Sequence, residues 1–336
     1  MPRARLDDED EIEEGGVYFD DVESIKTFTT GCNVLDCALG GGWARRRMIN
    51  IVGDKSTGKT LLAIEAAANF TRCFADGLVK YREVESAFDE DYAQSVGFPL
   101  DRCDLKEGLI TVEEVNADIE KTIEENTDNV PIMYVIDSLD ALSDDAEQNR
   151  DITDGTYGTK AKVVSEFFRR QNGPMSRANI TLLVISQIRA NIGVTFGAKY
   201  TRSGGKALDF YASQIVWLAQ VSKIKRVRKG ITRITGVNIK ADVKKNKVGK
   251  PFRQCDFPII FDYGMDDLIA GIDFLKTTKR LDAIGLSVKA ADALLRKAGK
   301  LSQEDYDHER SNITEAVREV WAEIEAAFRP PRKKYV

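Results

Sequence analysis

One segment has the residue types and spacing of a phosphate-binding loop. Residues 53–60 read Gly-Asp-Lys-Ser-Thr-Gly-Lys-Thr, and they separate an apolar, strand-like run from a helical one. Glycines let backbone N–H groups turn inward around phosphates, and the N-terminus of the following helix adds positive potential. Lys59 would reach the β- and γ-phosphates of a nucleoside triphosphate, and the Thr60 hydroxyl would ligate Mg²⁺. The predicted phosphate site consists of Gly53, Asp54, Lys55, Ser56, Thr57, Gly58, Lys59 and Thr60.

Acidic residues at two further places could complete this site. Residues 132–136 are an apolar run that ends directly at Asp137, where a carboxylate would hold Mg²⁺ beside the phosphates. Glu83 and Glu85 lie near the end of another strand-like run, and either could orient a water for hydrolysis. Because side chains alternate along a strand, both would lie on the same face, and spacing alone does not choose between them.

The elements that must position these residues alternate between strand and helix. Strand-like runs are expected at residues 48–52, 79–84, 131–137, 180–187 and 214–221. Helical patterns lie between them, at residues 60–74, 115–124 and 159–171. Buried strands that alternate with helices predict an α/β fold with a mostly parallel central sheet flanked by helices. Residues 232–240 and 252–261 predict an antiparallel β extension of the same sheet.

Three regions are expected along the chain. Residues 1–24 would be an acidic N-terminal arm, which could contact a neighbouring subunit through the short apolar run 17–19. Residues 25–266 would form the nucleotide-binding core. Residues 267–336 would be a small helical C-terminal region that ends in a basic tail.

Charge is divided unevenly along the chain, whose net charge is −5. Residues 7–23 hold ten acids and no base. Residues 221–253 hold twelve lysines and arginines against one aspartate, a net charge of +11. This basic strip predicts a site for a polyanion, which the acidic arm could partly shield. An ordinary solvated surface is the alternative for the strip.

Composition argues against a membrane or secreted protein. No apolar run reaches the roughly 18 residues that a membrane span needs, and acids rather than an apolar stretch follow the N-terminus. The five cysteines lack metal-ligand spacing, which favours reduced thiols. We therefore expect a cytoplasmic protein.

Several segments together resemble RecA-type recombinases. Residues 85–93, Glu-Ser-Ala-Phe-Asp-Glu-Asp-Tyr-Ala, are similar to the family segment in which a glutamate activates water and an aspartate and a tyrosine contact adenine. The resemblance assigns these roles to Glu85, Asp89 and Tyr92. It implies a RecA-type P-loop ATPase core that uses ATP and Mg²⁺. Lys245 and Lys247 are similar to the paired lysines that reach the ATP of the neighbouring subunit.

Residues 185–189, 193–197 and 204–213 resemble the second DNA-binding loop of the family with its flanks. Gln187 stands where the family has a sensor of the γ-phosphate, which couples ATP to the order of that loop. The polar segment 191–203 could bind single-stranded DNA by phosphate contacts and base stacking. A second loop, at residues 149–158, has a single base. The candidate DNA contacts are Arg150, Arg189, Phe196, Lys199, Arg202, Gly204, Gly205 and Lys206. Ordinary surface loops are the alternative for both segments.

The resemblance covers about residues 25–275 and implies an ATP-dependent DNA recombinase. Such a protein would be a DNA-dependent ATPase that forms a helical filament on single-stranded DNA and pairs it with a homologous duplex. The shortened, acidic N-terminus and compact helical C-terminus are similar to phage-encoded members of the family, and for such a member the expected location is the host cytoplasm. Two alternatives stay open from the sequence: a recombinase-like mediator with weak ATPase activity, and a hexameric helicase that forms a ring.

Overall fold

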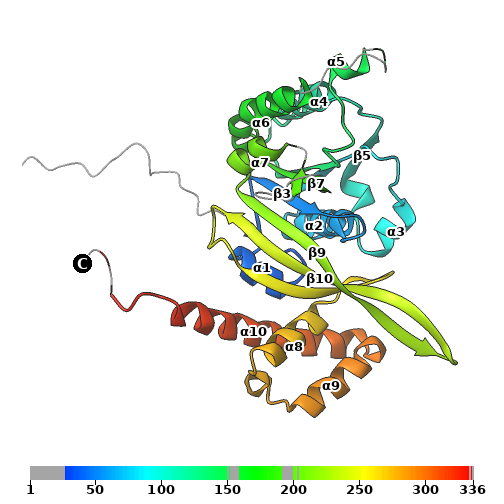
Figure 1. The fold of residues 1–336 in the computed structure, drawn as a ribbon, viewed down its shortest axis with the longest axis vertical. Coiled ribbons are helices and arrows are strands. Elements are labelled where there is room, and N and C mark those ends of the chain that lie inside the picture. The colour runs from blue at the N-terminus through cyan, green and yellow to red at the C-terminus, as the bar shows by residue number, and fades with distance from the viewer. Residues whose placement is uncertain are drawn as a thin grey trace, which may run out of the picture.

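A central sheet of ten strands organises the chain (Figure 1). The computed structural model describes residues 27–149, 151, 159–190, 200–202, 204–332 and 334. Along the sheet the strands follow the order β12-β11-β10-β9-β3-β7-β6-β4-β5, and β8 lies beside β7. One half of this order is parallel and the other antiparallel, as the sequence predicts.

The parallel half contains the strands that were expected to carry the nucleotide site. Its members are β3 (Met48–Gly53), β4 (Leu78–Glu83), β5 (Cys103–Glu107), β6 (Ile132–Asp137) and β7 (Ile180–Ala190). Every residue of β3 and β6 is buried, because helices cover the sheet on both faces. The carboxyl ends of β3, β4 and β6 therefore meet at one edge of the sheet.

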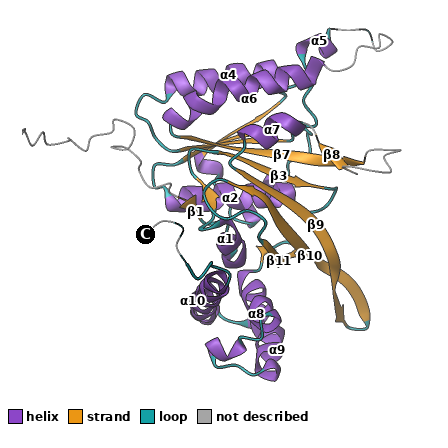
Figure 2. Cartoon of the chain, turned by 60° about the vertical axis from the view of Figure 1, so that its left-hand side comes forward, coloured by secondary structure: helices purple, strands orange, loops and turns teal. Residues whose placement is uncertain are grey.

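Helices on the two faces make two separate hydrophobic cores (Figure 2). One face carries α4 (Val112–Glu125), α6 (Thr159–Arg177) and α7 (Gly205–Tyr211). The other carries α1 (Asn33–Leu39) and α2 (Lys59–Cys73). Shorter elements are β1 (Thr27–Phe28), β2 (Trp43–Ala44), α3 (Glu90–Ser95), the 3-10 turn Leu100–Arg102, α5 (Asp145–Gln148) and β8 (Tyr200–Arg202).

A long β-hairpin dominates the antiparallel half. It consists of β9 (Gln214–Arg228) and β10 (Ile231–Asn246), and β11 (Gln254–Ile260) and β12 (Gly264–Met265) follow it. Its two turn residues, Lys229 and Gly230, have φ of 50° and 75°, which suits the tight turn of a twisted hairpin. The far end of the hairpin extends beyond the body of the protein (Figure 1).

The C-terminal region is helical and packs beneath the antiparallel strands (Figure 2). It contains α8 (Asp267–Thr277), α9 (Val288–Lys297) and α10 (Gln303–Ala327), with 3-10 turns at Leu281–Ile284 and Ala298–Lys300. Glu325 of α10 accepts hydrogen bonds from Lys250 (2.7 Å) and Arg253 (2.5 and 2.7 Å), just after β10. No helix in the described ranges is long and apolar enough to cross a membrane.

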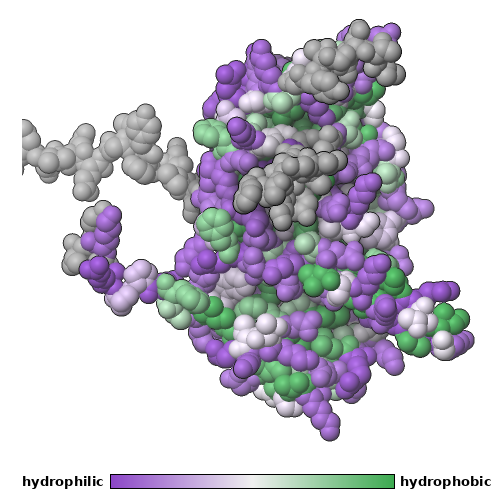
Figure 3. Space-filling model, in the orientation of Figure 1, coloured by the Kyte–Doolittle hydropathy of each residue, from purple (hydrophilic) through white to green (hydrophobic). Residues whose placement is uncertain are grey.

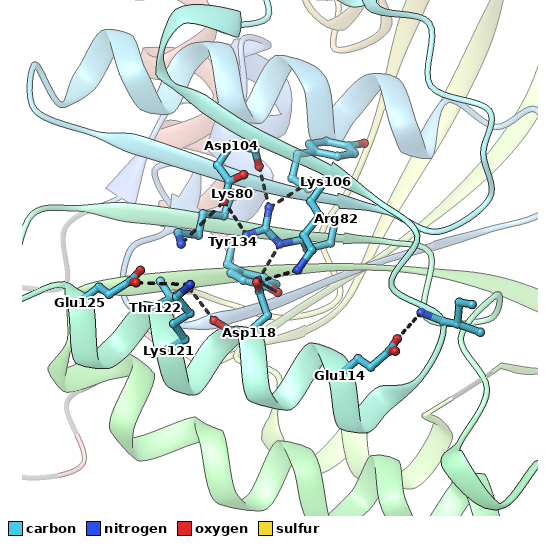
Figure 4. Close-up of polar contacts among 12 residues, drawn as sticks. Lys80, Arg82, Asp104, Lys106, Glu114, Asp118, Lys121, Thr122, Glu125 and Tyr134 are labelled. Atoms are coloured by element: carbon cyan, nitrogen blue, oxygen red, sulfur yellow. Dashed lines mark hydrogen bonds and ion pairs between the residues drawn. The ribbon is translucent and has the colours of Figure 1, made fainter. Parts of the chain in front are cut away.

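Strand β4 is fixed by a buried ion-pair network (Figure 4). The Arg82 side chain is only 1% exposed, and its Nε and Nη2 atoms lie 2.7 Å from Asp118 and 2.8 Å from Asp104. The Tyr134 hydroxyl also donates to Asp118, at 2.7 Å. Although burial opposes ionisation, these hydrogen bonds hold the pKa of Asp118 below its usual range. The network thus ties β4 to β5, β6 and α4.

The predicted fold class is confirmed, and two local expectations are wrong. Strand β5 was missed, because its edge sequence, Cys-Asp-Leu-Lys-Glu, is short and largely polar. Residues 200–202 were expected in a loop, but they form β8 and pair with 188–190 of β7. The boundary at 266 stays a prediction, with α8 beginning at Asp267. The arm at 1–24 lies outside the described residues.

Candidate functional site

The predicted phosphate-binding loop joins β3 to the start of α2. A side chain on Gly53 would place its Cβ 2.4 Å from Oγ1 of Thr57, and one on Gly58 would meet Ile259 at 2.3 Å. Gly58 also has φ of 81°, in the left-handed region. The loop therefore needs glycine at both ends. Lys59 Nζ donates to the Asp54 carbonyl at 2.8 Å, which keeps the ammonium over the loop.

A pocket of about 390 Å³ is lined by the loop, the start of α2, the strands β6 and β7, and the turn after β4. Its lining comprises Lys55, Ser56, Thr57, Gly58, Lys59, Thr60, Leu61, Glu85, Asp137, Ile185 and Gln187. Burial lowers the pKa of Lys59, while the nearby carboxylates of Asp137 and Glu85 raise it. The structure thus brings together residues as far apart in the sequence as Lys55 and Gln187, which are 132 positions apart.

Thr60 and Asp137, the predicted Mg²⁺ ligands, lie in contact. Asp137 ends β6, where it accepts hydrogen bonds from the Tyr81 hydroxyl (2.8 Å) and from Thr60. Burial raises the pKa of Asp137 to about 6, against these two hydrogen bonds. A hydroxyl and a carboxylate are the hard oxygen ligands that suit Mg²⁺. Among the described residues, no group of three or more histidine, cysteine or acidic side chains is placed to hold a metal ion.

Glu83 and Glu85 lie in different environments. Glu83 is buried, and its carboxylate accepts the backbone N–H groups of Glu85 (3.0 Å), Ser86 (2.7 Å) and Ala87 (3.3 Å). Glu85 is exposed at the pocket, where its Oε1 accepts hydrogen bonds from Ser138 (2.6 Å) and Gln187 (2.8 Å). The expectation of a shared strand face is wrong, because β4 ends at Glu83 and the chain turns there. The Glu83 carboxylate thus stabilises the turn that places Glu85 in the pocket.

Asp89 and Tyr92, the predicted adenine contacts, form the start of α3. The Asp89 side chain caps this helix by accepting the Tyr92 backbone N–H at 2.9 Å. Tyr92 is half-buried, and burial raises its pKa, as do the nearby charges of Glu65 and Asp262. Tyr92 therefore lies close to α2 and to the turn between β11 and β12. Neither residue lines the phosphate pocket described above.

Lys245 and Lys247 point toward the C-terminal end of α7. Lys245 Nζ donates to the carbonyls of Asp209 and Phe210, the latter at 2.9 Å, and Lys247 Nζ donates to Phe210 at 3.5 Å. Cations are favourable at this end of a helix, where carbonyls lack partners. Burial and the charge of Lys247 lower the pKa of Lys245. Among the described residues, neither lysine lines its own subunit's phosphate pocket.

The candidate DNA contacts are only partly described. Arg150, Phe196 and Lys199 lie outside the described residues, and for Arg189 the structure describes only the backbone, in β7. Gly204 has φ of 71° at the start of α7, and a Cβ there would lie 2.8 Å from both Leu139 and Leu208. Gly204 is therefore required by packing. Gly205 and the exposed Lys206 line an open pocket of about 570 Å³ beside α6.

Arg202 differs from its expected setting. We expected an exposed base, but Arg202 is buried in β8, and its Nη2 lies 2.5 Å from Asp209 Oδ1. Within the described chain, its Nη1 is buried without a hydrogen-bond partner. The sequence contains no local signal for this pair, because the two residues meet only when α7 folds back along β8. In this conformation Arg202 is not presented to a DNA phosphate.

The far end of the hairpin, residues 221–234 (the hairpin tip), carries exposed bases and apolar side chains (Figure 3). Its exposed apolar residues are Val221, Val227, Ile231 and Ile234. Arg226 and Arg228 share a cleft of about 360 Å³ with Arg296 and Lys300 from the end of α9 and the turn after it. Sequence reasoning missed the last two, which join the basic strip only through the tertiary fold.

Comparisons with known proteins agree with this geometry. A family model described as the RecA N-terminal domain matches residues 16–266. Protein RecA of Nostoc punctiforme is 34% identical over 255 residues, 76% of this chain and 68% of the relative. Protein RecA of Porphyromonas gingivalis is 34% identical over 307 residues, 89% of this chain and 86% of the relative. These matches do not favour the mediator or the helicase. The chain belongs to the RecA family of ATP-dependent recombinases.

Proposed function

We propose that this recombinase hydrolyses ATP in a DNA-dependent reaction at the pocket between the phosphate-binding loop and Glu85. One observation carries the proposal: Lys59, Glu85, Asp137 and Gln187, from four different elements, line the same pocket. In a P-loop ATPase, catalysis is mainly positioning and charge stabilisation around the γ-phosphate, and these are the side chains that such chemistry needs.

Each residue of the pocket has a proposed role. Lys59 neutralises the β- and γ-phosphates, and Thr60 and Asp137 hold Mg²⁺, which supplies further charge neutralisation when it is bound. Glu85 orients the attacking water and accepts its proton, because its carboxylate is exposed in the pocket and positioned by two hydrogen-bond donors. Asp89 and Tyr92 bind the adenine.

Gln187 would report the nucleotide state to the DNA-binding segments. Its amide donates to Glu85, and its backbone lies in β7, one residue before the part of β7 that pairs with β8. A γ-phosphate that draws the Gln187 amide away from Glu85 would therefore act on both the catalytic acid and the strand that leads into residues 191–203. Gln187 would thereby couple the binding of ATP to the arrangement of the DNA-binding segment.

Single-stranded DNA is the proposed partner of the region around α7 and the loops before it. The proposed contacts are Arg150, Arg189, Phe196, Lys199, Gly204, Gly205 and Lys206. Arg202 is not among them, because it is buried and paired with Asp209. The hairpin tip, with six bases and no acid, would hold the phosphate backbone of DNA by charge. We further propose that subunits assemble as a helical filament, in which Lys245 and Lys247 serve the neighbour's ATP, and that the filament pairs its strand with homologous duplex DNA.

ATPase measurements and electron microscopy together test this proposal. We expect single-stranded DNA to stimulate turnover, and we expect helical filaments with single-stranded DNA, ATP and Mg²⁺. Lys59→Ala should abolish nucleotide binding or turnover, because it removes the cation that neutralises the phosphates. The exposed Lys121→Ala on α4 is the control. Closed rings would point to a helicase, and absence of DNA stimulation at any salt concentration would point to a mediator.

A further inference from the structure

Helix α7 is contacted at its last turn by side chains from two different parts of the fold. From one side, Arg202 of β8 forms an ion pair with the Asp209 side chain at 2.5 Å. From the other, Lys245 at the end of β10 donates to the backbone carbonyls of Asp209 and Phe210. Asp209 therefore binds both residues: its carboxylate pairs with Arg202, and its backbone carbonyl accepts a hydrogen bond from Lys245.

Arg202 also lies close to residues of the nucleotide pocket. Strand pairing places Arg202 opposite Ile188, the residue after Gln187. The Gln187 backbone N–H donates to Asp140 at 2.6 Å, and Asp140 lies near enough to Arg202 to raise the pKa of its guanidinium against the effect of burial. Gln187 is thus bonded to an aspartate whose charge acts on Arg202, and Arg202 is in turn paired with Asp209, whose carbonyl accepts from Lys245.

The difference in burial between Arg202 and Asp209 shows which side chain has the fixed position. The Arg202 side chain is 4% exposed, whereas the Asp209 side chain is 66% exposed. An unpaired buried guanidinium would strongly lower the free energy of unfolding. The ion pair with Arg202 therefore fixes the position of Asp209 and of the end of α7. The exposed aspartate covers no core, but its removal leaves the buried guanidinium unpaired, so a test must measure stability as well as turnover.

We propose that Arg202 and Asp209 are positioning residues for ATP hydrolysis: their ion pair sets the end of α7 and so places Lys245 and Lys247 toward the neighbouring subunit's nucleotide. The inference rests on the proposed function, since it requires those lysines to act on the neighbour. A charge must be placed closely to stabilise a reaction, and a displacement of about 1 Å can cost about 100-fold in rate. Residues 204–206, the proposed DNA contacts at the start of α7, lie between Arg202 and Asp209 in the sequence, so DNA bound there would act on the same pair.

Asp209→Ala is the principal test, with stability measured by urea unfolding beside turnover. We expect the turnover number (kcat) of the DNA-stimulated ATPase to fall about 10-fold to 100-fold, with KM for ATP and affinity for single-stranded DNA changed less than about twofold. Asp209 is an anion, so its removal cannot delete a contact to a DNA phosphate. Asp242→Asn is the matched control: this acid lies on the same strand as Lys245 but pairs with Lys244, at 2.5 Å. The control should retain wild-type turnover.

A double-mutant cycle separates positioning from general damage. If Arg202 acts through Asp209, Arg202→Ala/Asp209→Ala loses no more turnover than the worse single variant, and Asp209→Glu recovers part of the loss. Additive losses, or unchanged turnover in Asp209→Ala, would overturn the inference. Should Asp209→Ala fail to fold, Asp209→Asn keeps an acceptor oxygen, and a several-fold loss of kcat at constant KM is then expected; no loss overturns the inference. A wild-type protein without DNA-stimulated turnover would instead refute the proposed function itself.

Discussion

The amide of Gln187 donates a hydrogen bond to Glu85 Oε1 over 2.8 Å, between residues that are 102 positions apart in the chain. This bond crosses the edge of the sheet, from the turn after β4 to the end of β7. It holds the proposed catalytic acid through a side chain that lines the same pocket as Lys59 and that we propose to sense the γ-phosphate. On the proposed mechanism, hydrolysis at Glu85 and the position of the last part of β7 would both depend on this contact.

Separate substitutions of Glu83 and Glu85 distinguish the catalytic acid from the residue that stabilises the turn beside it. Glu85→Gln should keep ATP binding but slow hydrolysis about 10²-fold to 10⁴-fold, because the side chain can no longer accept a proton. Glu83→Gln should keep much more activity, since an amide oxygen can still accept some of the backbone N–H groups of the turn. Single-turnover ATPase assays with a separate nucleotide-binding measurement check both. Normal hydrolysis in Glu85→Gln, with loss in Glu83→Gln, would show that Glu83 is the catalytic acid.

The network around Arg82 predicts a stability effect without a direct catalytic one. Asp118→Ala should lower the free energy of unfolding by about 3 kcal/mol, because it leaves a buried guanidinium with Asp104 as its remaining ionic partner. Lys106→Ala removes a half-exposed partner of Asp118, at 3.4 Å, and should cost less than about 1 kcal/mol. Urea unfolding of the two variants measures the difference. Equal stability losses would mean that the buried ion pair does not fix β4.

Much of the fold follows from local patterns, and the exceptions have tertiary causes. The apolar run 48–52 predicted β3, because a strand covered on both faces must be apolar throughout. The polar edge strand β5 has no such constraint, and it was missed. The phosphate-binding loop was predicted from the sequence, because its backbone geometry requires glycine at fixed spacing. The different settings of Glu83 and Glu85 depend on where β4 ends, and the burial of Arg202 depends on α7, so neither was predictable from spacing.

Glu65 predicts how stability changes with pH. It is buried on α2, where it accepts the Met265 backbone N–H at 2.7 Å, and burial raises its pKa from 4.5 to about 8. Since the folded state holds this proton more tightly, the stabilising contribution is complete below pH 4.5 and is lost as the pH rises to about 8. The slope is at most about 1.4 kcal/mol per pH unit.

Glu65→Gln, which mimics the protonated acid, should therefore be more stable than the wild type at pH 8 to 9 and similar to it at acidic pH. Urea unfolding at both pH values measures the difference, and Glu319→Gln, an exposed position on α10, is the control. Identical pH dependence in Glu65→Gln and the wild type would show that this carboxyl does not titrate in the expected range.

Lys245 and Lys247 predict a dependence of hydrolysis on assembly. Both donate to the end of α7 rather than to their own subunit's phosphate pocket, so their charge is available at a surface. Lys245→Ala/Lys247→Ala should bind ATP almost normally yet lose DNA-stimulated turnover. A cation supplied by a neighbouring subunit is worth about 10³-fold to 10⁵-fold in rate in arginine-finger enzymes, which sets the scale of the loss.

Mixed filaments decide whether these lysines serve the neighbour or the DNA. A Lys59→Ala subunit has intact lysines but no working phosphate site, and the double-lysine variant has the reverse defect. Mixing the two should restore part of the turnover, because one subunit supplies the cations and the other the ATP. If the lysines instead contact the DNA backbone, mixing restores nothing, and the double variant binds single-stranded DNA with a shallower dependence of log affinity on log salt concentration, since fewer phosphates are neutralised.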